Sequence, residues 1–234
     1  MATEFTTYFN CGSRLTWTYP GAGRSGEEKR VFNDGTRQSI IYNPTQNPVS
    51  MEYDGLFDAL AGVSQPPVVA DAPTKGEHTD FNWLTYVPGK TTVQQLQQAN
   101  VLTGPMSGCL LIVWKPDAMN GQSLCHVGTN YDDPASTRTV KQDFDRVITS
   151  ESTGFKPDAA WELKEISTPM IKLSTGPNAG QVSFKIFGLV TTAGKFYSII
   201  MFQMLAQGQN IWCAGGIKEV PPMTFQDLKQ KLAT

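Results

Sequence analysis

The chain has 234 residues, of which 40% are hydrophobic, enough to bury one sizeable core. Charged residues make up 17%, the formal net charge is −2, and no basic run is present, which argues against a nucleic-acid-binding protein. No apolar run is long enough to span a bilayer, and the N-terminal residues lack the order of a secretory signal. We expect a single soluble, monomeric domain over residues 1–234, with no membrane partner.

The spacing of the cysteines and the number of glycines and prolines limit the possible fold classes further. The four cysteines, Cys11, Cys109, Cys125 and Cys213, are scattered without a CxxC pair, so a zinc ribbon or a disulfide scaffold is not expected. We therefore expect reduced thiols and neither a metal nor a cofactor. The 21 glycines and 15 prolines favour many turns between short strands over long helices.

In the first third of the chain, the pattern predicts two strands and a long irregular region. Residues 13–19 alternate polar and large apolar side chains, which is the period of a half-buried strand. Residues 38–42 form a second candidate strand. From about residue 44 to 80 the chain is rich in Pro, Gly and acidic residues, so we expect an irregular or mobile region around one short helix, Tyr53–Leu60.

The middle of the chain combines strands with a predicted capped helix. Asn82–Val87 is typical of a strand, and the Thr-x-x-Gln form of Thr92–Gln95 is that of a capping box, which predicts a short helix to about Ala99. Two unbroken apolar runs, Cys109–Trp114 and Leu124–Val127, predict neighbouring antiparallel strands.

The C-terminal half predicts two helices and a central hairpin. Asp133-Pro134 opens a helix whose apolar residues fall on one face, and Thr224 caps a last helix to Leu232. The strands expected between them are Trp161–Ile166, Gln181–Thr191, Phe196–Leu205 and Asn210–Cys213, with a hairpin turn at Ala193-Gly194. The predicted fold class is α+β: a mostly antiparallel β-sandwich flanked by three or four helices.

One cluster of residues suggests chemistry. Cys109 follows a Ser-Gly step at the mouth of a strand, His126 lies seventeen positions on, and Thr103 lies six positions before the cysteine. A thiol nucleophile needs a base within hydrogen-bond reach, and imidazole is the usual one. A simple hairpin register separates Cys109 from His126 by about three residues, roughly 10 Å, so a bulge or a position of Cys109 just outside the strand is required. Cys125 should face the opposite side and be part of the core.

The segment from Thr103 to Gly128 resembles the cysteine-dependent glutamine deamidases. These include the chemotaxis receptor deamidase, the catalytic domain of cytotoxic necrotizing factor, and Burkholderia lethal factor. Their nucleophile sits in a Leu-Ser-Gly-Cys or similar step, followed by a histidine after a strand-loop-strand, and some members have a threonine six positions before the cysteine. Here Met106 stands where the toxins have leucine.

The resemblance implies a protein glutamine deamidase domain that needs no metal or cofactor. Cys109 would be the nucleophile, His126 the base, and Thr103 would orient His126 through its hydroxyl or its carbonyl oxygen. From the residues themselves, Gly108 tolerates unusual dihedral angles and lets a substrate approach the backbone. The amide N–H of Cys109 is our candidate oxyanion donor.

The resemblance also implies a protein substrate. The toxin members act on host cytosolic proteins, a translation-initiation RNA helicase and Rho-type GTPases, whereas the chemotaxis enzyme acts on bacterial receptors. We expect a toxin or effector exported by a route without a cleaved signal and active in host cytosol. The alternatives are a transglutaminase or peptidase that shares the thioester intermediate, and a non-catalytic binding module with a structural, buried Cys109.

Overall fold

Strands dominate the structure, a computed structural model in which three helices lie among the described residues. The described residues are 4–21, 23, 40–43, 48–57, 60–61, 73–96, 99–116, 122–149, 155–162, 172–173, 180–181, 184–206 and 209–234. The three helices are α1 (Glu4–Tyr8), α2 (Pro134–Thr149) and α3 (Phe225–Ala233). The mostly β character with few helices agrees with the predicted α+β class. None of these helices has the length and apolar character to cross a membrane.

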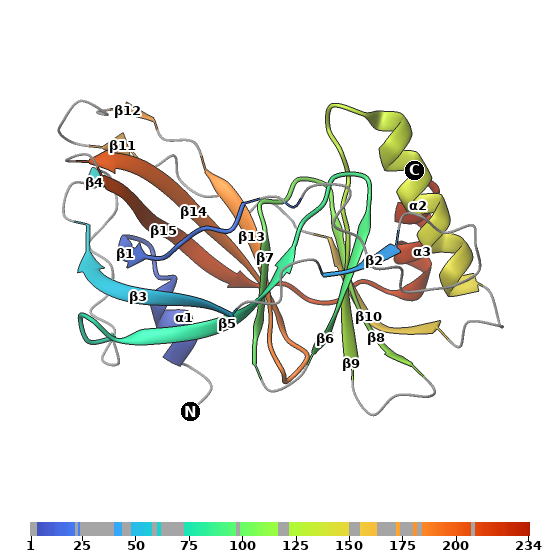
Figure 1. The fold of residues 1–234 in the computed structure, drawn as a ribbon, viewed down its shortest axis with the longest axis horizontal. Coiled ribbons are helices and arrows are strands. Elements are labelled where there is room, and N and C mark those ends of the chain that lie inside the picture. The colour runs from blue at the N-terminus through green and yellow to red at the C-terminus, as the bar shows by residue number, and fades with distance from the viewer. Residues whose placement is uncertain are drawn as a thin grey trace.

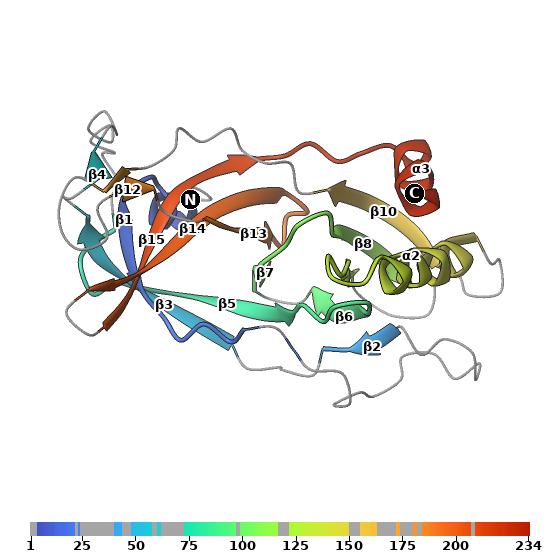
Figure 2. The ribbon, with the colours of Figure 1, turned by 90° about the horizontal axis from the view of Figure 1, so that it is seen from above.

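The largest sheet closes into a barrel instead of forming one half of a sandwich (Figures 1 and 2). Closure arises because β1 pairs with strands on both of its sides, so the sheet keeps no free edge. Its seven strands in order are β1 (Ser13–Thr16), β15 (Gln209–Glu219), β14 (Phe196–Ala206), β13 (Lys185–Val190), β7 (Val101–Gly104), β5 (His78–Thr85) and β3 (Pro48–Leu56). Neighbours are antiparallel except for β5 and β7, which are parallel.

A second sheet lies between the barrel and two of the helices. Figure 1 shows the barrel on the left, this sheet to its right, and α2 and α3 beyond it. Its strands in order are β10 (Phe155–Glu162), β8 (Leu110–Pro116), β9 (Gln122–Val127), β6 (Thr91–Leu96) and β2 (Ile40–Tyr42). A small third sheet contains β12 (Gly180–Gln181), β11 (Lys172–Leu173) and β4 (Leu60–Ala61).

Side-chain alternation divides the apolar residues of the five-stranded sheet between two cores. On β8, Leu110, Ile112 and Trp114 pack with α2 and α3, whereas Leu111 and Val113 pack toward the barrel. The barrel contributes outward-facing residues from several strands to this second core, which we call the interface core: Leu84, Val101, Val190 and Phe196. We call the core that packs against α2 and α3 the helix-side core. Because successive side chains of a strand point to opposite faces, β8 contributes residues to both the helix-side core and the interface core.

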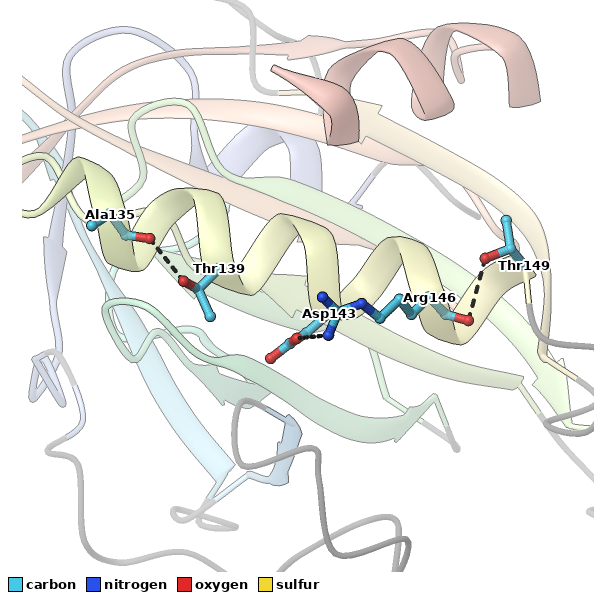
Figure 3. A network of polar contacts seen from close by, with 5 residues as sticks. All are labelled: Ala135, Thr139, Asp143, Arg146 and Thr149. Atoms are coloured by element: carbon cyan, nitrogen blue, oxygen red, sulfur yellow. Dashed lines mark hydrogen bonds and ion pairs between the residues drawn. The ribbon is translucent and has the colours of Figure 1, made fainter.

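Helix α2 covers the sheet with one face and exposes the other. Val140, Phe144, Val147 and Ile148 are buried, as the spacing of apolar residues predicts. The exposed side carries local polar contacts, shown in Figure 3: Thr139 Oγ1 donates to Ala135 O at 3.0 Å, Arg146 pairs with Asp143 at 3.2 Å, and Thr149 Oγ1 donates to Arg146 O at 3.3 Å. These contacts link neighbours within one helix and touch no other element.

The prediction of a helix over Thr92–Ala99 is wrong. Residues 91–96 form β6, which pairs antiparallel with β9 and parallel with β2. The β-branched run Thr91-Thr92-Val93 suits a buried strand, and all three side chains are buried. Pairing on both sides therefore outweighs the local capping-box form of the sequence.

The short helix predicted over Tyr53–Leu60 is also wrong, and residues 48–56 and 78–80 of the region predicted to be irregular, 44–80, are strand. Residues 44–47, 58–59 and 62–72 of that region lie outside the described residues. Residues 48–56 form β3, in which Val49, Met51 and Tyr53 are buried inside the barrel at a period of two. His78–Thr85 forms β5, and β3 and β5 pair with each other. Glu52 and Asp54 alternate with these apolar positions, so the strand period is present in the sequence, and the acidic composition of the region was a poor guide to its structure.

Other predicted elements are confirmed. Strands β8 and β9 pair antiparallel, and β13 and β14 form the hairpin, with Gly194 N donating to Thr191 O at 2.9 Å in its turn. Thr224 caps α3 through a capping box with Asp227. Residues 38–39, 163–166 and 182–183, which were included in predicted strands, lie outside the described residues.

Truncation of Phe144 should show how much the α2 contact contributes to stability. Phe144 is fully buried against the sheet, whereas Phe225 on α3 is 53% exposed. We expect Phe144→Ala to lower the free energy of unfolding by about 3–5 kcal/mol and Phe225→Ala by less than about 0.5 kcal/mol. Denaturant unfolding of the two variants measures both values, and equal losses would contradict this packing.

Candidate functional site

A hydrogen bond between Thr103 and His126 connects the barrel to the five-stranded sheet. Thr103 lies on β7 of the barrel and His126 on β9. The Thr103 Oγ1 and His126 Nδ1 atoms are 2.7 Å apart, and both residues are fully buried in the interface between the two sheets. The structure thus brings together two of the three predicted site residues, and the contact uses the threonine hydroxyl.

The second partner of the Thr103 hydroxyl determines the tautomer of His126. Thr103 Oγ1 donates its hydrogen to Leu84 O at 2.6 Å, and a carbonyl oxygen can only accept. The hydroxyl must then accept from Nδ1–H of His126, which leaves Nε2 as a lone-pair nitrogen. Nε2 has no hydrogen-bond partner in the described part of the chain. Burial lowers the pKa of His126 to about 3, so the ring is neutral at neutral pH.

Cys109 lies just before β8, on the same side of the sheet as His126. Leu110 pairs with Val127 and Leu111 with His126, so continuing the register places Cys109 opposite Gly128. The separation along the strands is therefore two residues, roughly 7 Å, instead of the three predicted. Cys109 and Leu111 both belong to the interface core. The predicted requirement that Cys109 lie outside the strand is met.

The sulfur of Cys109 nevertheless contacts a residue other than His126. Its Sγ lies 3.4 Å from Thr129 Oγ1, and Thr129 Oγ1 in turn donates to Ser107 O at 2.8 Å. Since the single hydroxyl hydrogen is used there, the thiol hydrogen goes to Thr129 Oγ1 or to Ser107 O, which lies 3.9 Å from Sγ. No hydrogen bond joins Cys109 to His126 among the described residues. Burial raises the pKa of the Cys109 thiol, so the sulfur is protonated at neutral pH in this arrangement.

An exposed dipeptide directly precedes the buried Cys109 in the chain. Cys109 is 1% exposed, whereas Ser107 and Gly108 before it are exposed. Gly108 has φ +71°, a backbone conformation that residues with a side chain rarely adopt, while a Cβ there would meet only Thr129 Oγ1 at 3.7 Å. Glycine is required here by the backbone angle and not by lack of space.

Tyr86 and Thr129 complete the surroundings, and the sequence pattern did not single out either. The Tyr86 ring lies 5.3 Å from the His126 ring, centroid to centroid, at an interplanar angle of 30°. Its hydroxyl donates to Thr129 O at 2.6 Å. Burial raises the pKa of Tyr86 to about 12, with smaller contributions from Cys109 and Asp132. Tyr86 therefore contacts both the His126 ring and Thr129, the residue next to the Cys109 sulfur.

The other thiols and acidic groups do not form a metal centre among the described residues. No group of three His, Cys, Asp or Glu side chains gathers closely enough there to bind an ion. All four cysteines are free thiols. Cys125 is fully buried in the helix-side core, on the opposite face from His126 as predicted, and burial raises its pKa. Asp133 Oδ1 accepts from Ser136 N at 3.0 Å, which is a helix-capping contact.

Comparison with family models, with curated proteins and with solved structures gave no match to this chain.

The buried, neutral His126 should make the fold sensitive to acid. Its folded pKa of about 3 lies below the usual 6.5, so its contribution is complete above pH 6.5 and is lost as the pH falls toward 3. We expect this residue to reduce the free energy of unfolding by up to about 1.4 kcal/mol per pH unit in that window. Denaturant unfolding of His126→Phe between pH 7 and 4 should show a shallower decline than the wild type.

His78, the other histidine, provides the matched control. It is exposed at the start of β5, with its Nε2 3.6 Å from Glu52. His78→Phe should retain the acid sensitivity of the wild type, because His126 is still present. Identical slopes for wild type and His126→Phe would mean that His126 is not buried as a neutral ring.

Proposed function

We propose that this chain is a cysteine-dependent protein glutamine deamidase. Cys109 is the nucleophile, His126 the general base and acid, and Thr103 the residue that orients His126. The reaction converts a glutamine side chain of a target protein to glutamate and releases ammonia. It requires no metal or cofactor.

The observation that carries the proposal is the Thr103–His126 hydrogen bond. It holds the imidazole with Nδ1 protonated, so the unprotonated Nε2 is the nitrogen that can take a proton. This nitrogen is on the face of the sheet that also carries Cys109. A base with a fixed tautomer thus lies on the same face as a thiol, two positions along the ladder, and a rotation of the thiol would have to bring the two within hydrogen-bond reach.

The chemistry proceeds in two halves. The sulfur of Cys109 attacks the carboxamide carbon while its proton passes to Nε2 of His126, and the backbone N–H of Cys109 stabilises the oxyanion. His126 then returns the proton to the departing nitrogen, which leaves as ammonia, and a thioester remains. Water, deprotonated by the same nitrogen, adds to the thioester and releases the carboxyl group and the thiol.

In this proposal the structure is a resting state that substrate must alter. The thiol is protonated and lies within hydrogen-bond distance of Thr129 Oγ1 and Ser107 O, while Nε2 of His126 has no hydrogen-bond partner among the described residues. Cys109 has to turn from Thr129 toward His126, and the exposed Ser107-Gly108 step before it has to move to admit a glutamine side chain. A protein target that contacts this step supplies binding free energy for that change.

The substrate class follows from the resemblance and is part of the proposal. We propose a bacterial toxin or effector that acts on a host cytosolic protein, with a translation-initiation helicase and Rho-type GTPases as the first targets to test. A transglutaminase would use the same thioester but would transfer the acyl group to an amine. Incorporation of an added primary amine, in place of release of ammonia alone, separates the two.

The burial of the thiol favours a second candidate, a non-catalytic binding module in which Cys109 is structural. A protonated sulfur with 1% exposure is what a packing role requires. Native labelling with iodoacetamide distinguishes the two. A Cys109 that reacts no faster than the partly exposed Cys11 favours the binding module.

Replacing the nucleophile tests the deamidase directly. Wild-type protein and Cys109→Ser are incubated with host cell extract, and tryptic peptides are searched by mass spectrometry for Gln-to-Glu conversions. We expect conversions in the wild-type sample that fall to background in Cys109→Ser, because a hydroxyl is far less acidic and less nucleophilic than the thiol it replaces. Cys11→Ser, which changes a thiol remote from the site, should retain the wild-type pattern. The same conversions in all three samples would refute the deamidase.

Removing the Thr103 hydroxyl should reduce activity through the orientation of His126. Thr103→Val keeps the shape of the side chain but frees the ring, and misplacement of a catalytic group costs about 100-fold in rate. Thr85→Val is the matched control, because Thr85 on neighbouring β5 is equally buried and its hydroxyl has no partner in the described part of the chain. Turnover of the identified target peptide by both variants measures the difference, and equal activities would remove Thr103 from the site.

A further inference from the structure

We propose that Thr129 is a positioning residue for the Cys109 thiolate, and that its hydroxyl changes partner from Ser107 O to Cys109 Sγ when the sulfur loses its proton. The inference rests on the proposed thiol chemistry and adds a residue to it. It concerns the step before attack, in which a buried thiol has to become an anion.

The geometry around the hydroxyl allows two hydrogen-bond arrangements. Thr129 Oγ1 lies 2.8 Å from Ser107 O and 3.4 Å from Cys109 Sγ, and it has one hydrogen. In the thiol state that hydrogen goes to Ser107 O, and Oγ1 can accept the S–H hydrogen, for which Ser107 O at 3.9 Å is the other acceptor. A thiolate has no hydrogen to give, so two sets of lone pairs would face each other. Rotation of the hydroxyl about its C–O bond then directs its hydrogen to the sulfur.

The proton balance needs no further reactant. The thiol proton leaves for Nε2 of His126 in the proposed reaction, or for solvent base in a labelling experiment. No covalent bond of Thr129 forms or breaks. Ser107 O loses one hydrogen bond in the thiolate state and lies next to solvent, where water replaces it.

The backbone around Thr129 is held from several directions. Gly128 N donates to Lys90 O and Gly89 N donates to Gly128 O, both at 2.9 Å, and the Tyr86 hydroxyl holds Thr129 O. The approach is so close that a Cβ on Gly128 would lie 2.4 Å from Val87 O. The oxygen that faces the sulfur is therefore fixed by the β5–β6 connection, as a positioning residue requires.

The charges near the sulfur are few. Burial raises the pKa of the Cys109 thiol, whereas hydrogen bonds from the Thr129 side chain and backbone and from the Ser107 backbone, and the charge of Lys141 on α2, lower it. Cys109 and Asp132 act on the pKa of Tyr86, and His126 is neutral above about pH 3. Among the side chains around the sulfur, Thr129 is thus the hydrogen-bond donor to a thiolate.

The test is the pH dependence of Cys109 alkylation in the folded protein. Iodoacetamide reacts with the thiolate, forming a carbon–sulfur bond as iodide leaves, and peptide mass spectrometry reports Cys109 separately from the other cysteines. The midpoint of the rate profile follows the acidity of the thiol, whereas its plateau follows access. A merely structural role for Thr129 would move the plateau and leave the midpoint in place.

We expect Thr129→Val to shift the midpoint upward by about one pH unit, which is about tenfold slower labelling below the midpoint. Thr129→Ser keeps the hydroxyl and should restore the wild-type midpoint. Thr139→Val is the remote control, since the Thr139 hydroxyl donates only within α2, to Ala135 O (Figure 3). If thermal melting shows that Thr129→Val does not fold, Thr129→Ala removes the same hydroxyl without adding a methyl group.

An unchanged or lowered midpoint in the folded Thr129 variant overturns the inference. So does a Cys109 that stays unlabelled at every pH in the folded wild type, because such a thiol gives no thiolate to hold. The outcome is separable from the deamidase assay. A shifted midpoint without any Gln-to-Glu conversion refutes the proposed function alone, and conversion with an unshifted midpoint refutes the role of Thr129 alone.

Discussion

The Thr103 hydroxyl is the polar connection on which the arrangement of the two sheets around the site depends. It lies in an apolar interface, donates to Leu84 O within the barrel and accepts from His126 on the neighbouring sheet. In such surroundings an unmet hydrogen bond costs about 1–3 kcal/mol, so any slip of β7 against β9 is disfavoured. The same bond fixes which nitrogen of His126 carries the proton. The Thr103 side chain thus favours one register of β7 against β9 and one tautomer of His126.

That arrangement leaves one polar atom unsatisfied, which bears on why a histidine is there at all. Nε2 of His126 is buried without a partner among the residues that the structure describes, and an apolar ring of similar size would avoid the penalty. Trp83 Nε1 and Thr85 Oγ1 are also buried with no hydrogen-bond partner in the described ranges, so burial alone does not distinguish His126. The distinguishing fact is the combination of an unsatisfied acceptor, a fixed tautomer and a thiol on the same face. If His126 served only for packing, the unsatisfied acceptor would be an energetic cost without a use. The proposed proton transfer would use the acceptor, the fixed tautomer and the nearby thiol.

Local patterns predicted the hairpin at the site but not its surroundings. Unbroken apolar runs identified β8 and β9, and Pro134 with its apolar periodicity identified α2, because those signals lie within each segment. Thr92–Gln95 was assigned to a helix because capping is local, while the two flanking strands that pair with β6 are distant in sequence. Barrel closure is equally non-local. Thr129 and Tyr86 escaped notice since their contacts join residues 20 and 43 positions apart, with no motif to mark them.

The site is formed where the chain passes between layers. The β5–β6 connection carries Tyr86, the β7–β8 connection carries Cys109, and the segment from β9 to α2 carries Thr129, while Thr103 and His126 lie within strands. The first and third connections hold each other through the bonds of Gly128 and Tyr86. The second is anchored at Met106, whose N–H donates to Ile186 O at 2.9 Å, and again at the start of β8. The exposed Ser107-Gly108 step between these anchors is therefore the part that can move without breaking a sheet, so in the proposed function a substrate would open the site there.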